Sequence, residues 1–144
     1  MEISIIDRKT GDHQRLTREK VCQFLFKHLD QYGDPLEHIE KCYDYAMKTG
    51  NGGFITVAHE GENIAGVVLM NETGMGGYIP ENILVYIAVN QAVRGKGVGK
   101  KLMEAACSRA NGAVALHVEP DNPARHLYEK IGFTNKYLEM RLNK

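Results

Sequence analysis

The chain has 144 residues, enough for one domain that buries roughly two-thirds of the surface exposed by its unfolded chain. Its 18 Lys and Arg residues balance its 18 Asp and Glu residues, so no overall field favours nucleic acid or an anionic membrane as a partner. No apolar run approaches the roughly 18 residues of a membrane span, and Met1-Glu2-Ile3 does not open a signal peptide, so we expect a cytoplasmic protein.

The first half of the chain predicts a strand, two helices and a hairpin. Glu2 to Asp7 has the apolar positions of a strand, and Thr17 is placed to cap a helix. Asp34 and Pro35 predict the N-cap and first turn of a second helix, which ends in the glycines of residues 50–53. Two further strands, over residues 54–60 and 64–71, are joined by the turn Gly61-Glu62-Asn63.

In the second half, strands and helices alternate. Residues 83–89 are all apolar, which predicts a strand buried on both faces and central in a sheet. A helix begins near Val98, and a strand follows over residues 113–119. A short helix over residues 123–130 and a last strand over residues 137–142 complete the chain. The pattern predicts an α/β fold with one mixed sheet and a single domain over residues 1–144.

Three groups of residues that often mark chemistry suggest none here. Cys22, Cys42 and Cys107 are odd in number and lack C-x-x-C spacing, so we expect buried, reduced thiols. The six histidines include no pair at H-x-x-x-H spacing, so we expect no metal. Ser4 and Ser108 lie outside any nucleophile-elbow pattern, which leaves no candidate for a covalent acyl-enzyme.

The chemistry-bearing pattern lies where the central strand meets the following helix, over residues 92–101. Unpaired amides and the partial positive charge of a helix N-terminus attract anions, and glycines allow close approach of the backbone. The segment therefore predicts a phosphate cradle. Its members are the amides of Gly95, Lys96, Gly97, Val98, Gly99 and Lys100, with charge added by Arg94, Lys96, Lys100 and Lys101. The plain alternative is a glycine-rich turn with solvated lysines.

Two nucleotide motifs fit this loop poorly. It is one residue shorter than a P-loop, and Lys101 stands where Ser or Thr would hold magnesium. Lys100 takes the place of the last glycine of the dinucleotide fingerprint.

The loop resembles the coenzyme A signature of the GNAT acetyltransferases, R/Q-x-x-G-x-G/A, which Arg94-Gly95-Lys96-Gly97-Val98-Gly99 matches at every fixed position. A second stretch, residues 122–133, is similar to the family's N-x-x-A-x-x-L-Y-E-K-x-G-F. The element order agrees over essentially the whole chain. The resemblance implies a mostly antiparallel sheet of six to seven strands, about four helices, and acetyl-CoA as the cofactor.

The resemblance also implies roles for single residues. The cradle amides would bind the pyrophosphate, and Ile87, Ala88 and Val89 would pair with the pantetheine arm. Asn122 would contact the same arm, although it precedes Tyr128 by six residues where the family has seven, so Asp121 is the alternative.

The catalytic expectations follow from the same resemblance. Tyr128 would protonate the leaving thiolate, and its alternative is a core aromatic. The carboxylate that many members carry on the central strand is absent, because Val85 and Tyr86 stand there. We expect His117 to accept the amine's proton, with Glu81 next; solvent and two further carboxylates, Glu72 and Glu119, are the other candidates.

These residues predict an N-acetyltransferase that moves an acetyl group from acetyl-CoA to a primary amine of a small molecule or peptide. A non-catalytic acyl-CoA-binding module and a nucleotide-binding protein are the alternatives. No nucleic-acid or membrane partner is expected. The acceptor and the oligomeric state, including a homodimer, are left open.

Overall fold

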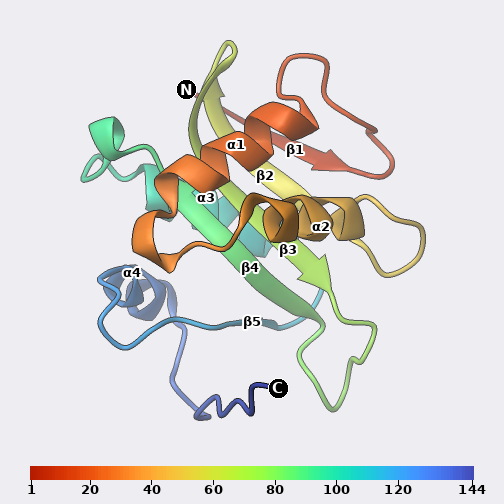
Figure 1. Cartoon of the computed structure of the whole chain (residues 1–144), viewed down its shortest axis with the longest axis vertical. Coiled ribbons are helices and arrows are strands. Elements are labelled where there is room, and N and C mark those ends of the chain that lie inside the picture. The colour runs from red at the N-terminus through yellow and green to blue at the C-terminus, as the bar shows by residue number, and fades with distance from the viewer.

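One five-stranded sheet, with its strands in chain order, carries the protein; a computed structural model describes all of residues 1–144 (Figure 1). The strands are β1 (Glu2–Asp7), β2 (Gly53–Glu60), β3 (Asn63–Glu72), β4 (Asn82–Val89) and β5 (Val114–Leu116). The helices are α1 (Arg18–His28), α2 (Leu36–Ala46), α3 (Val98–Arg109) and α4 (Ala124–Ile131), with 3₁₀ turns η1 (Asp30–Tyr32) and η2 (Gln91–Val93). The first four strands are antiparallel, whereas β5 runs parallel to β4.

The helices cover both faces of the sheet. In Figure 1, α1 and α2 lie in front of the strands and α3 lies behind them. Each face has its own core: one includes Val21 of α1 and Tyr43 of α2, and the other includes Leu102 of α3 and Tyr128 of α4. No helix is long and apolar enough to cross a bilayer.

Locally encoded features are confirmed. The Thr17 side chain accepts the Lys20 amide and caps α1, and β1 has the predicted bounds. The hairpin of β2 and β3 forms as expected. Gly132 ends α4 with a left-handed φ of 118°.

The second helix begins differently from the prediction. Its N-cap is Pro35, and no side chain caps it. Asp34, predicted as the cap, instead accepts a hydrogen bond from the hydroxyl of Tyr86. A buried tyrosine hydroxyl needs an acceptor, and the carboxylate supplies it.

Strand β5 pairs over its whole length with the first three residues of β4. The ladder joins residues 82–84 of β4 to residues 114–116 of β5. The Asn82 side chain donates to the backbone oxygens of Asn111 and Ala113, and Glu81 accepts the Ala113 amide at 2.8 Å. Beyond Leu116 the chain leaves β4 and runs toward α4 (Figure 1). The strand predicted to run to Glu119 therefore ends at Leu116.

The expectation that β4 is buried along both faces is wrong at Val85, which is 37% exposed. The pairing with β3 skips this residue: Met70 is opposite Leu84, and Leu69 is opposite Tyr86. Such a bulge re-aims the side chains that follow it. As a result Leu84 packs on the α3 side, whereas Tyr86 packs on the α1–α2 side.

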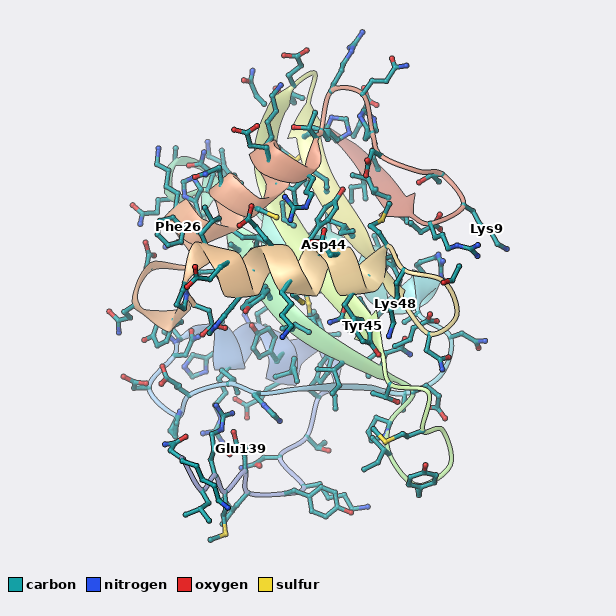
Figure 2. The ribbon with its side chains drawn as sticks, turned by 45° about the vertical axis from the view of Figure 1, so that its right-hand side comes forward. Lys9, Phe26, Asp44, Tyr45, Lys48 and Glu139 are labelled. Carbon is teal, nitrogen blue, oxygen red and sulfur yellow. The ribbon has the colours of Figure 1, made fainter.

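The expectation of six to seven strands is also wrong. Residues 137–142 form no strand, and the large apolar side chains of the segment are exposed; they are Tyr137, Leu138, Met140 and Leu142. Glu139 lies away from the sheet in Figure 2. The three-residue β5 offers too short a ladder to hold another strand beside it.

Candidate active site

The loop before α3 adopts the form expected of an anion cradle. Gly95 and Gly97 both have φ of +82°, a left-handed conformation that favours glycine. A Cβ atom at either position would meet nothing within 4 Å, so the space above the loop is open. Gly97 is the N-cap of α3. The backbone can therefore be approached closely at the positive end of a helix.

Six consecutive amides in this loop, those of residues 95–100, have no hydrogen-bond acceptor. The nearest bonded amides are those of Arg94, which donates to Gln91, and Lys101, which donates to the Gly97 oxygen at 3.2 Å. The side chains of Lys96 and Lys100 are exposed around the same loop. A row of free donors with cations beside it is suited to bind an anion such as a pyrophosphate.

Arg94 is placed differently from the rest of the predicted cradle. Its Nε donates to the Val89 oxygen at 3.0 Å, and its Nη2 donates to the His28 oxygen at 3.0 Å. The same nitrogen lies 3.3 Å from the Asp30 carboxylate. Arg94 therefore ties the end of β4 to the end of α1.

The edge of β4 beyond Leu84 has no neighbouring strand. The Asn90 amide donates to the Ala65 oxygen on the β3 side at 2.8 Å. Because backbone groups alternate along a strand, the amides of Ile87 and Val89 point to the free edge. The Ala88 amide points to β3, so Ala88 lies along the free edge but presents no hydrogen-bond donor to it. An extended chain could pair with this edge.

The cradle, the free edge and α4 meet at Gly99. A Cβ atom there would lie 3.2 Å from Cδ2 of Leu127 and 3.6 Å from Cγ2 of Val89. The missing side chain lets the first turn of α3 lie against both neighbours. Gly99 therefore places the cradle beside the free edge and beside the helix that carries Tyr128.

Tyr128 is 7% exposed and packs beside Phe133, with ring centroids 6.1 Å apart. Its hydroxyl makes no hydrogen bond in the structure. Burial raises the pKa of Tyr128 to about 12, so the hydroxyl carries its proton at neutral pH. The Tyr128 hydroxyl can therefore donate its proton, and no protein group accepts a hydrogen bond from it.

Asn122 and Asp121 have different roles in the turn before α4. The Asn122 Oδ1 accepts the Ala124 amide at 2.9 Å, so this side chain orders the first turn of the helix. Its Nδ2 makes no hydrogen bond. Asp121 is exposed, and its backbone oxygen lies 3.5 Å from the hydroxyl of Tyr32.

The residues predicted to accept the proton of the amine do not lie together in the structure. The His117 side chain is 66% exposed, and its Nδ1 lies 3.9 Å from a carboxylate oxygen of Glu139. Glu81 precedes β4 and Glu72 ends β3 opposite Asn82, so both lie roughly 20 Å along the sheet from Val89. The Ala113 amide lowers the pKa of Glu81 and holds its carboxylate in place. Glu119 is exposed after β5.

The sequence did not predict one hydrogen-bonded pair near this region. The Tyr86 hydroxyl donates to Oδ2 of Asp34 at 2.5 Å, across 52 residues of chain. The only sequence signal was a buried strand tyrosine, which requires an acceptor somewhere.

Comparison with known proteins assigns this chain to a family. Residues 51–135, more than half of the chain, match the model of the acetyltransferase (GNAT) domain. A curated relative, the 5-NmdU N-acetyltransferase of Pseudomonas phage PaMx11, is 39% identical over 87 residues. That match covers 58% of this chain and 59% of the relative, so the chain spans about three-fifths of the relative's length.

Solved structures agree at the level of the fold. A ribosomal-protein-alanine N-acetyltransferase from Brucella melitensis superposes with a TM-score of 0.65 and 16% identity, covering 100% of both chains. An aminoglycoside N-acetyltransferase in complex with CoA superposes with a TM-score of 0.70 and 15% identity, covering 99% of this chain and 93% of the other.

Gly97→Glu is expected to abolish coenzyme A binding while the protein stays folded. The carboxylate would fill the open space above the loop and repel the pyrophosphate. Gly97→Ala is the matched control: it brings the same backbone strain without the charge, and should weaken binding far less. Calorimetry with coenzyme A measures both, and unchanged affinity in a folded Gly97→Glu protein would disprove the cradle.

Proposed function

Because the chain belongs to the GNAT acetyltransferase family, we propose that it transfers an acetyl group from acetyl-CoA to a primary amine. The observation that carries the proposal is the junction at Gly99. At this junction, three neighbouring elements carry six free amides, an unpaired strand edge and a protonated tyrosine whose hydroxyl makes no hydrogen bond.

The cofactor would lie along β4. The amides of residues 95–100 would bind the pyrophosphate, with Lys96 and Lys100 beside it. The Ile87 and Val89 amides would pair with the pantetheine arm, and the free Nδ2 of Asn122 would donate to it from the other side. Arg94 would support this site by holding the end of β4, since its own charge is already paired with Asp30.

Bound acetyl-CoA would supply an acetyl group activated as a thioester. The Val89 amide would donate a hydrogen bond to the carbonyl oxygen as negative charge develops on it. Tyr128 would donate its proton to the departing sulfur, which its raised pKa permits because the proton is present at neutral pH. Burial of the ring keeps water from competing at this position.

The attacking amine must first lose a proton, because alkylamines have a pKa near ~10.4. We propose His117 for this role. Its neighbours Leu116 and Val118 pack toward α3 and α4, so the imidazole points to the opposite side, where it is open to solvent. Glu81 is a poorer candidate, because its carboxylate is bound by the Ala113 amide at the distant end of β4.

The test measures thioester consumption with a panel of amines. The panel includes 5-NmdU, which appears in the name of the phage relative. Amine-dependent release of free thiol from acetyl-CoA supports transfer. Tight coenzyme A binding without turnover of any amine would instead favour a non-catalytic acyl-CoA-binding module, for which the missing strand carboxylate is the motivating observation.

Tyr128→Phe should lower kcat by about 10²-fold or more with little change in affinity for coenzyme A, because only the proton donor is removed. Steady-state kinetics under conditions where chemistry limits the rate provide the measurement. Tyr137→Phe, which changes an exposed tyrosine outside the site, is the control. A near-normal kcat for Tyr128→Phe would return this residue to a packing role.

His117→Ala should reduce kcat/KM by roughly tenfold or more and flatten its fall on the acidic side of the pH profile. Glu81→Gln should leave that acidic limb in place and lower the thermal stability instead, because Glu81 holds the start of β5. If His117→Ala keeps both the rate and the acidic limb, the assignment is wrong.

A further inference from the structure

The chain has two serines, Ser4 and Ser108, and the fold gives them different surroundings. Ser108 is exposed in the last turn of α3, and its side chain makes no hydrogen bond. Ser4 is half-buried on β1, and its Oγ lies 2.7 Å from Nε2 of His59 on β2, across 55 residues of chain. The sequence around Ser4 has no nucleophile motif and offered no candidate for a covalent acyl-enzyme. The fold supplies the missing partner.

Ser4 and His59 share one face of the sheet because they are diagonal neighbours in the β1–β2 ladder. Ser4 is opposite Val57, and His59 is two residues further along β2. Val57 belongs to the core beneath α1 and α2, so the pair lies on that face. Strand β1 is the edge of the sheet opposite β5, three strands away from β4 (Figure 1). At about 4.8 Å between strands, the pair is separated from β4 by roughly 14 Å across the sheet.

The hydrogen bonds of His59 fix which ring nitrogen can accept a proton. Its Nδ1 lies 2.9 Å from the carbonyl oxygen of Gly61. A carbonyl oxygen only accepts hydrogen bonds, so Nδ1 carries the hydrogen. In the neutral ring Nε2 is then the basic nitrogen, and the hydroxyl of Ser4 donates to it. His59 is 5% exposed, so its surroundings hold the ring in this orientation.

This arrangement is that of an activated nucleophile. A serine hydroxyl within hydrogen-bond reach of a base, with the base oriented by a third group, can lose its proton as the oxygen attacks. Here the three groups are the hydroxyl of Ser4, the imidazole of His59 and the carbonyl of Gly61. None of them belongs to the site on β4, so the pair can support chemistry of its own.

A second histidine and a cavity lie beside the pair. The ring of His13 is edge-on to that of His59, with centroids 6.3 Å apart. The Nδ1 of His13 accepts two backbone amides, so the hydrogen of its neutral ring is on Nε2. His13 also lines a cavity of about 400 Å³, together with Ile6 and Thr10. The cavity has room for a small acyl group, and the N–H of His13 is a candidate donor to a developing oxyanion.

We propose that Ser4 is a nucleophile that takes an acetyl group from a small activated ester, with His59 as its base. The Oγ of Ser4 forms a bond to the carbonyl carbon, and its proton passes to Nε2 of His59. The bond from that carbon to the leaving oxygen then breaks, and Nε2 returns the proton to the leaving group. The ester and the serine hydroxyl thus become an O-acetylserine and an alcohol. The inference does not depend on acetyl transfer to amines.

The test treats the full-length protein with p-nitrophenyl acetate and maps the acetylated residues by peptide mass spectrometry over time. Ser4 should be acetylated at least roughly tenfold faster than Ser108, because only Ser4 has a base beside it. Saturating coenzyme A should leave the rate at Ser4 unchanged, since the pair lies apart from the cofactor strand. Equal rates at the two serines, or protection of Ser4 by coenzyme A, would overturn the inference.

His59→Gln should lower the rate of acetylation at Ser4 by roughly 10²-fold, because glutamine can accept a hydrogen bond from the hydroxyl but cannot take its proton. Ser108→Ala is the control, and it should leave the rate at Ser4 within about twofold of wild type. Circular dichroism and thermal unfolding establish that each variant is folded. A folded His59→Gln protein that is acetylated at Ser4 at the normal rate would show that His59 is not the base.

Ser4→Cys tests the same base without a change at the buried histidine. The thiol is close to the hydroxyl in size and can donate to Nε2 of His59. It should react with iodoacetamide several-fold faster than the thiol of Ser108→Cys, although position 4 is the less exposed of the two, because a neighbouring base favours the thiolate. A rate for Ser4→Cys equal to or below that of Ser108→Cys would overturn the inference. Such a result would leave acetyl transfer to amines untouched.

Discussion

After β5 the chain leaves the side of β4, and the candidate site depends on this separation. Backbone groups inside a sheet require partners, and β4 loses its partner beyond Leu84. Arg94 satisfies the Val89 oxygen, but the Ile87 and Val89 amides remain directed to the free edge. The divergence is held at one end by the bonds of Glu81 and Asn82 around Ala113. The other end is fixed by packing of α4.

Gly99 joins this free edge to the anion cradle. Its missing side chain allows the first turn of α3 to contact Val89 on the strand and Leu127 on α4. The anion cradle therefore begins where the free edge ends. A ligand with a phosphate group at one end and an extended arm would contact both without a gap. Coenzyme A, the cofactor of the GNAT family, has this form.

The sequence predicted the features that depend on neighbouring residues. The Thr17 cap, the hairpin, the two glycines of the cradle and the end of α4 at Gly132 all follow from local chemistry. It did not predict features that depend on distant partners. The bulge at Val85 leaves no pattern in an apolar run. The local pattern predicted Asp34 as a cap, whereas its partner in the structure is the distant Tyr86. Residues 137–142 have a strand pattern, but a strand needs an edge, and three residues of β5 do not provide one.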